Sequence, residues 1–231
     1  LITAVALGVD VACVLGVAAK SGLRFFRPAT AGTLGATMAI GKLRSFDKDE
    51  LIRACSIAFG QIGGTMQAHA EGSSLLAVQM GFAARNAVMA SDLASAGIDG
   101  PRNIIEGEFG YLNMIEDGYA FNSLLLDLGK KWQITQVAHK PFPSGRATHG
   151  IVDCCLELRE RHNLLQDDIV SVKCDVPPLI HQLVGRPPNI NMTPNYARLC
   201  GAYTVACALK HGTVDVSHYR PENISDPTVQ K

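Results

Sequence analysis

The sequence lacks an excess of charge of either sign. Lysine plus arginine and aspartate plus glutamate each number 21 among 231 residues, so the formal net charge at pH 7 is zero. Proteins that bind nucleic acid normally carry a basic excess. We therefore expect no nucleic-acid partner, and any attraction for an anionic ligand must come from the local placement of cationic side chains.

Motifs that bind metals or nucleotides are also missing. The seven cysteines include no Cys-x-x-Cys pair, and their odd number fits neither a disulfide framework nor a zinc site. No phosphate-binding loop and no dinucleotide-binding fingerprint occurs. We expect a protein without metal or cofactor, whose cysteines are mostly buried small residues in a reducing, cytoplasmic compartment.

One long hydrophobic run, residues 1–19, needs an explanation. It carries Asp10 near its middle and has no basic segment before it. A charge at the centre of a bilayer costs roughly 2.5–3.5 kcal/mol. We therefore expect a buried helix of an all-α domain and no membrane association, with a membrane span as the alternative.

Hydrophobic periodicity predicts helices through the first half of the chain. Asp47 followed by Glu50 is a capping-box pattern at the start of one of them, and Gly97 lies just past the end of another. Another of them is rich in alanine and glycine, which allows neighbouring helices to approach closely. The predicted helices cover residues 1–20, 33–44, 48–59, 73–97 and 101–106.

The pattern changes near residue 137. Residues 132–137 and 169–176 alternate apolar and polar side chains, which predicts two strands. Helices are predicted at residues 147–162 and 194–210. The second part of the chain therefore has an α+β pattern.

The expected fold class is mainly α with an α+β second part. We expect an all-α helical core domain over residues 1–137 and a smaller α+β lid domain over residues 138–231, both partial. The sequence starts at Leu1 inside a helical pattern and stops at Lys231 in polar sequence. We therefore expect an internal fragment of a longer chain.

The densest group of candidate catalytic side chains is residues 139–149, His-Lys-Pro-Phe-Pro-Ser-Gly-Arg-Ala-Thr-His. Its two prolines prevent a helix over the first half, and a helix is predicted to begin near Arg146. Such a turn gathers Lys140, Arg146 and backbone N–H groups at one place, which suits a carboxylate or phosphate. The alternative is an ordinary strand-to-helix loop whose charged side chains are solvated.

This segment resembles a motif of the MmgE/PrpD family, in which Lys-Pro-[Phe/Tyr]-Pro and a small residue precede Arg-Ala-Thr-His. Other segments match the family in order and spacing over essentially the whole chain. No single segment is specific, but the ordered set is. The matching segments are Gly32–Ala36, Ala68–Ser73, Gly81–Arg85, Ile105–Gly110 and Asn195–Arg198.

The resemblance implies a cofactor-independent lyase that acts on a small polycarboxylate by abstraction of an α-proton, similar to 2-methylcitrate dehydratase. It also implies a helical core and a lid with the active site between them, and a homodimer. One alternative is an epimerase of a small imino or amino diacid that uses the same intermediate. Another is a paralogue without catalytic activity.

The resemblance also assigns roles to side chains in two segments. Lys140 is expected to bind a carboxylate or transfer a proton, and the alternative is a solvated lysine. Gln67 and His69 stand near positions where the family commonly has a lysine and a histidine. His69 is the expected general base or a buried, hydrogen-bonded histidine, and His149 is either a proton-transfer group or a packed histidine.

Further residues are expected to bind substrate. Arg27 replaces an active-site histidine of many family members, and arginine cannot act as acid or base near neutral pH but can hold a carboxylate. Thr30 is expected to hydrogen-bond substrate or to cap the helix of residues 33–44. Arg146 is expected to bind a carboxylate, and the alternative is that it caps a helix or lies at the surface. Tyr196 is expected to reach the substrate, and the alternative is that it only packs within the lid. The complete expected substrate-binding set is Arg27, Thr30, Gln67, Ser144, Arg146 and Tyr196.

Overall fold

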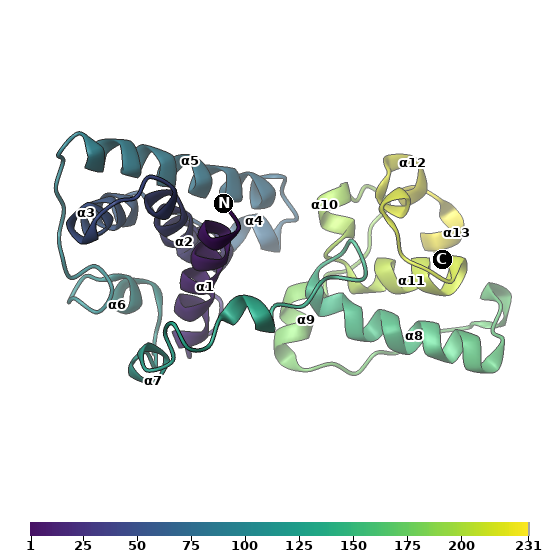
Figure 1. Ribbon diagram of the computed structural model, residues 1–231. Helices are drawn as coiled ribbons and strands as arrows, with labels where there is room; N and C mark the ends of the chain where they lie inside the picture. Colours follow the sequence, from purple (N-terminus) through teal and green to yellow (C-terminus); the bar gives the residue numbers. More distant parts are fainter. Residues whose placement is uncertain (231) are drawn as a thin grey trace. The chain divides into compact units, whose positions relative to one another are not determined.

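The structure, a computed structural model, describes residues 1–230, with side chains as far as Val229. The chain forms two compact units (Figure 1). Unit 1 contains residues 1–66 and 75–137, and unit 2 contains residues 67–74 and the chain from Ala138 onward. Segment 67–74 therefore groups with unit 2, although sequence alone assigned all of residues 1–137 to one domain.

Unit 1 is helical, as predicted. Helix α1 packs on α2, and both α2 and α3 pack on the long helix α5. The core includes large side chains from the segment that follows α5, such as Tyr111 and Leu112. The elements are α1 (Ile2–Ala18), α2 (Arg27–Leu43), α3 (Lys48–Phe59), α5 (Leu75–Ser95), α6 (Tyr111–Ile115), α7 (Asn122–Leu125) and the 3-10 helix η1 (Gln133–Gln136).

Helices α1 and α2 cross with their backbones in contact. A β-carbon on Gly8 would lie 2.7 Å from the carbonyl oxygen of Gly35, and one on Gly35 would lie still closer to the carbonyl oxygen of Gly8. No side chain larger than hydrogen fits at either position without a shift of the helices. The close helix approach predicted from the glycine and alanine content is confirmed.

Helix α1 is buried along one side only, so the predicted burial of the whole helix is wrong. Ile2 and Val17 are 86% and 59% exposed, whereas Asp10 faces inward. The carboxylate of Asp10 accepts a hydrogen bond from the backbone N–H of Gln133 at 2.6 Å, which satisfies the buried charge. Among residues 1–230, no helix is long and apolar enough to cross a membrane.

The starts and ends of the other predicted helices are mostly close to those observed. Helix α3 begins after Asp47, whose carboxylate and the Glu50 side chain form the predicted capping box. Helix α2 begins six residues earlier than predicted, at Arg27 instead of residue 33, because Pro28 occupies its first turn, where proline is well tolerated.

The helix predicted at residues 101–106 is wrong, since these residues form turns. The carbonyl oxygens of Ile104 and Ile105 accept hydrogen bonds from the N–H groups of Tyr111 and Leu112. These oxygens therefore serve residues seven positions later and close a loop, and the next helix is α6.

Unit 2 is also helical in the described residues. Helices α8 and α11 pack against each other. The helix predicted at 194–210 is interrupted at Arg198–Cys200 and becomes two. The elements are α4 (Gln67–Ala70), η2 (Arg146–Thr148), α8 (His149–His162), η3 (Gln166–Asp168), α9 (Pro178–Val184), α10 (Pro194–Ala197), α11 (Gly201–His211), η4 (Val216–Tyr219), α12 (Pro221–Ile224) and α13 (Pro227–Gln230).

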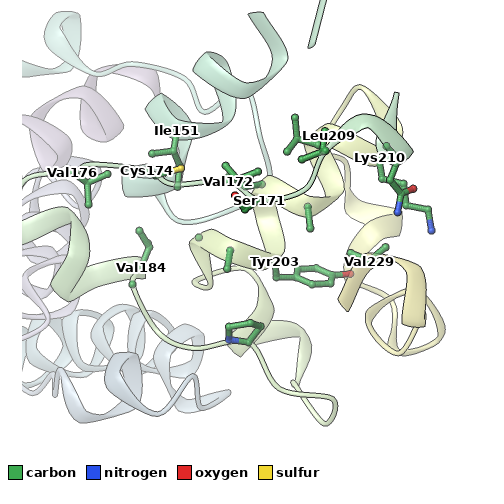
Figure 2. A pocket seen from close by; sticks show the side chains of 18 of the residues that line it. Ile151, Ser171, Val172, Cys174, Val176, Val184, Tyr203, Leu209, Lys210 and Val229 are labelled. Atoms are coloured by element: carbon green, nitrogen blue, oxygen red, sulfur yellow. The ribbon is translucent and has the colours of Figure 1, made fainter. Parts of the chain in front are cut away.

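Neither predicted strand forms, so the α+β lid is not observed. Most of residues 132–137 form η1. Residues 170–176 have no regular secondary structure and, within residues 1–230, make no backbone hydrogen bond to another segment. An alternating pattern stabilises a strand only through cross-strand partners, and the described residues supply none. Most of residues 169–176 instead line an apolar cavity of about 690 Å³, and Val172, Cys174 and Val176 are among them (Figure 2).

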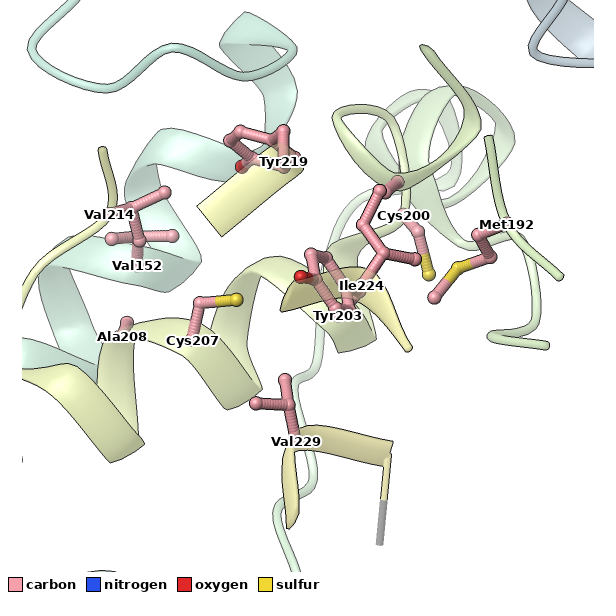
Figure 3. Packing of buried hydrophobic residues seen from close by; sticks show 11 residues of the cluster. Val152, Met192, Cys200, Tyr203, Cys207, Ala208, Val214, Tyr219, Ile224 and Val229 are labelled. Carbon is pink, nitrogen blue, oxygen red and sulfur yellow. The ribbon is translucent and has the colours of Figure 1, made fainter. Parts of the chain in front are cut away.

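The core of unit 2 gathers side chains from α8, α11 and the segments that follow α11 (Figure 3). Tyr203 and Tyr219 lie together there, with ring centroids 6.0 Å apart. The hydroxyl of Tyr203 donates to the carbonyl oxygen of His218 at 2.5 Å, so this buried polar group is satisfied.

The crossing of α1 and α2 gives a stability prediction. Replacement Gly35→Ala should lower the free energy of unfolding by about 1–3 kcal/mol, because the new methyl group forces the helices apart. The control Gly16→Ala lies in α1 with open space around it, and should raise that free energy by up to about 1 kcal/mol. Urea unfolding of both variants checks this, and equal effects would contradict the close crossing.

Candidate functional site

The proline-containing turn holds Lys140 and Arg146 at an exposed surface of unit 2. The Nζ atom of Lys140 donates to the carbonyl oxygen of Ser144 at 3.3 Å. Ser144 is buried, and its hydroxyl oxygen lies 2.6 Å from that of Thr148. Lys140 and Arg146 are therefore accessible to a ligand in this structure, whereas Ser144 stabilises the turn.

His149 starts helix α8 and is almost completely buried, with 1% of its surface exposed. Its ring lies edge-on to Phe142 with centroids 5.5 Å apart. Neither ring nitrogen has a hydrogen-bond partner among residues 1–230. Burial lowers the pKa of His149, so the imidazole is neutral near pH 7. This environment favours the packed histidine over the proton-transfer group.

His69 lies in α4 and contacts Arg186, which is 117 residues away in the sequence. The Nη2 atom of Arg186 donates to the carbonyl oxygen of His69 at 2.6 Å and lies 3.4 Å from its Nδ1 atom. His69 is half-buried, and burial together with the positive charge of Arg186 lowers its pKa. A neutral imidazole is able to accept a proton and so to act as a general base.

Tyr196 supplies the face on which Arg186 stacks. The guanidinium carbon lies 4.9 Å from the ring centroid, and the phenol hydroxyl donates to the carbonyl oxygen of Pro187 at 2.8 Å. Tyr196 therefore positions Arg186, and its hydroxyl is already engaged. Gln67, the other predicted residue of α4, is exposed, and its amide donates to the carboxylate of Glu71.

Segment 67–74 reaches this place through a tight backbone contact. Gly72 has a φ of +66°. A β-carbon on it would lie 2.7 Å from the Cα atom of Tyr196 and 3.0 Å from Nη1 of Arg186. Two side chains complete the attachment, because Thr193 donates to the carbonyl oxygen of Gly72 and Asn195 donates to the hydroxyl of Ser74.

In unit 1, Arg27 holds a carboxylate of the protein itself. Its Nε and Nη2 atoms donate to the two carboxylate oxygens of Glu116 at 3.0 and 2.8 Å. The Glu116 side chain is only 2% exposed, and Ser21 donates a further hydrogen bond to it. The hydrogen bond to Glu116 raises the pKa of Arg27. The carboxylate-binding capacity predicted for Arg27 is thus used internally.

Thr30 lies inside α2, so the alternative that it caps this helix is wrong. The residue has no exposed surface, and its hydroxyl oxygen is 3.1 Å from the hydroxyl of Tyr111. Burial raises the pKa of Tyr111, so the phenol stays protonated. Thr30 joins α2 to α6 in this structure and presents no atom at the surface for a ligand.

The apolar cavity in unit 2 contains none of the predicted site residues. Its walls include Val172, Val184 and Leu209 (Figure 2), and few of its groups would bind a charged acid. No three His, Cys, Asp or Glu side chains within residues 1–230 lie close enough together to hold a metal ion.

Sequence reasoning missed two features of these sites. It did not pair Glu116 with Arg27, because a carboxylate 89 residues away gives no local signal. It did not place Arg186 beside His69, because the approach of these two side chains depends on the tertiary fold. Gly72 is a local signal that could have indicated this contact, because glycine permits close approach of two backbones.

The described residues form two helical units, and unit 2 holds His69 beside Arg186 and, on a turn of its own, the exposed Lys140 and Arg146. Comparison with family models is more specific. The model of the MmgE/PrpD N-terminal domain matches residues 1–124, and that of the MmgE/PrpD C-terminal domain matches residues 142–231. The chain belongs to the MmgE/PrpD family, as its motifs predicted.

Curated relatives carry names of one activity. The chain is 27% identical to human cis-aconitate decarboxylase over 215 residues, which cover 90% of this chain and 43% of the human protein. It is 26% identical to a cis-aconitate decarboxylase-like protein of Aspergillus oryzae, over 86% of this chain and 44% of that protein. The chain therefore spans less than half the length of these relatives, which belong to a lyase-type family.

The ion pair in unit 1 leads to a stability prediction. Arg27→Met or Glu116→Leu alone should lower the free energy of unfolding by about 3 kcal/mol, because each leaves a largely buried charge unpaired. The double variant should lower the free energy of unfolding by much less than the sum of the two single effects. A double-mutant cycle measured by denaturant unfolding checks this coupling.

The exposed pair Arg102–Asp49 serves as the control for this cycle, since its side chains are 72% and 63% exposed. We expect a coupling of only about 0–1 kcal/mol there. A coupling between Arg27 and Glu116 no larger than this control would contradict the account of a buried, internally satisfied pair.

Proposed function

We propose that the protein is a cofactor-independent lyase that acts on a small polycarboxylate by abstraction of a proton next to a carboxylate. The observation that carries this proposal is the neutral His69 beside the cation Arg186 in unit 2. Membership of the MmgE/PrpD family and the relatives named cis-aconitate decarboxylase support it.

The chemistry needs three kinds of group. A base must remove the proton, cations must stabilise the charge that develops on the carboxylate, and an acid must assist the leaving group where water is lost. His69, with its lowered pKa, is the proposed base. Arg186 and the exposed Lys140 are the proposed cations, and Lys140 is also able to transfer a proton.

Arg27 does not take part in proton transfer in this proposal. Its guanidinium is charged at every accessible pH and is already paired with Glu116. The reaction therefore differs from that of family members with a histidine at this position, and the proton-transfer groups are those of unit 2. The dehydration first expected follows from proton abstraction by the base. Loss of carbon dioxide, as in the names of the relatives, instead breaks a C–C bond, and an acid must then protonate the carbon that keeps the electron pair; Lys140 is the proposed donor in that case.

An isomerase is the second candidate. The same Arg27–Glu116 pair favours it, because it removes one acid–base group that the family's histidine would supply for leaving-group departure. An intermediate formed by proton abstraction would then be reprotonated, and a small amino or imino diacid would be epimerised. Product analysis separates the candidates, since a lyase releases carbon dioxide or forms an alkene and an epimerase does neither.

Replacement of Lys140 tests the catalytic proposal directly. In Lys140→Ala, kcat/KM for the acid that is turned over should fall about 100-fold or more, since a cation near the developing charge is lost. Assays with cis-aconitate, 2-methylcitrate and an amino diacid measure this. Because Lys140 is exposed, the fold should be unaffected.

The matched control is Lys173→Ala, which removes an exposed lysine of unit 2 that forms an ion pair with Asp175. It should leave kcat/KM unchanged. Full activity in Lys140→Ala would refute the role of Lys140. Background turnover of every acid by the unaltered, folded protein would instead favour the paralogue without catalytic activity.

A further inference from the structure

Arg186 is a partly buried cation for which unit 2 provides an acceptor at one nitrogen only. Its Nη2 atom donates to the carbonyl oxygen of His69. Its Nε and Nη1 atoms are buried without a hydrogen-bond partner among residues 1–230. Among residues 1–230, no carboxylate forms an ion pair with Arg186. The neighbouring groups that favour its protonated form are Tyr196 and Cys200. Its positive charge is therefore uncompensated.

The position of the guanidinium group is fixed before any ligand arrives. It stacks on the ring of Tyr196, which is itself held by the hydrogen bond to Pro187. The Arg186 carbonyl oxygen accepts a hydrogen bond from the thiol of Cys200 at 3.3 Å. A ligand would thus bind to an ordered side chain, and binding would not be weakened by the entropy of ordering it.

Buried charges in proteins are normally paired, and buried donors are normally hydrogen-bonded. Arginine remains protonated at neutral pH even though burial lowers the pKa of Arg186. The group that best satisfies an arginine with unpaired N–H donors is a carboxylate, because its oxygens accept several charge-assisted hydrogen bonds.

We propose that Arg186 binds one carboxylate of a small dicarboxylic or tricarboxylic acid, which it holds beside the imidazole of His69. The stacking on Tyr196 and the close contact with Gly72 leave the guanidinium in place for this role. The inference rests on the proposed function only for the identity of the acid, because anion binding is measurable without turnover.

The acidic residue nearest to His69 in the sequence does not occupy this position. Glu71 is exposed, and its carboxylate accepts a hydrogen bond from Gln67 within the same segment. The site is therefore not closed by a carboxylate of its own, in contrast to Arg27, which Glu116 satisfies. Arg27 is therefore a structural cation, whereas the charge of Arg186 is left for a ligand in this proposal.

Titration calorimetry of the full chain with malonate, at constant ionic strength with chloride as the competing salt, tests the proposal. Arg186→Met keeps the apolar stem that lies on Tyr196 and removes the charge. We expect the malonate Kd to rise about 10-fold or more in this variant, since charge-assisted hydrogen bonds are lost. Arg186→Lys, which keeps the charge but not the planar group, should give an intermediate value.

The control is Arg159→Met, which removes another arginine of unit 2 whose Nε donor is satisfied by the carbonyl oxygen of Leu209. Its malonate Kd should equal that of the unaltered protein. An unchanged Kd in Arg186→Met, or no malonate binding by the unaltered protein, would overturn the proposal. Turnover is assayed separately on the same variants. If the unaltered protein turns over no acid but binds malonate, and Arg186→Met weakens this binding, the lyase proposal is refuted and the anion site is supported.

A second measurement needs no variant and covers the case in which Arg186→Met fails to fold. Malonate added to the unaltered protein should shift the imidazole NMR signals of His69 and leave those of the exposed His162 in place. Equal shifts at both histidines, or none at His69, would contradict binding beside this residue.

Discussion

The contact of Arg186 with the backbone of His69 is the interaction on which the functional account depends. It joins residues 67–74, which interrupt the sequence of unit 1, to unit 2. The lack of a side chain at Gly72 makes this contact possible, because a β-carbon there would collide with Tyr196. The result is that a histidine and an arginine from distant parts of the chain share one place, where burial and the positive charge of Arg186 lower the pKa of His69.

Two arginines in this chain show how burial decides between structural and functional roles. Arg27 has a buried carboxylate partner, and its charge is balanced inside unit 1. Arg186 has none, and part of its guanidinium is buried without an acceptor. A balanced pair gives little attraction for an external anion, whereas an unbalanced cation gives much. Arg27, at the position where the family resemblance implies a histidine, is therefore paired inside unit 1, and we propose that ligand recognition lies in unit 2.

Much of unit 1 was predictable because its helices are specified locally. The Asp47 capping box fixed the start of α3, and glycine and alanine content predicted the close helix approach. Residues 169–176 show where this reasoning ends. Their alternating pattern is a strand pattern, but a strand also needs a partner, and none of the described residues provides one.

The candidate site was predictable in part. The motif around Lys140 led to an exposed cation beside a rigid turn, and His69 was identified as a candidate base. The burial of His149 and the engagement of Tyr196 arise from tertiary packing and have no local signature. The pairing of His69 with Arg186 bridges 117 residues, which no spacing rule detects.

The most direct test of the central claim is proton exchange at carbon. The full-length protein is incubated in D₂O with cis-aconitate, 2-methylcitrate and an amino diacid, and the substrate signals are followed by proton NMR. The account predicts loss of a signal next to a carboxylate in one of these acids, together with a new product, and loss of this exchange in His69→Gln. Exchange that persists unchanged in His69→Gln, or a folded protein that exchanges no proton in any acid, would contradict it.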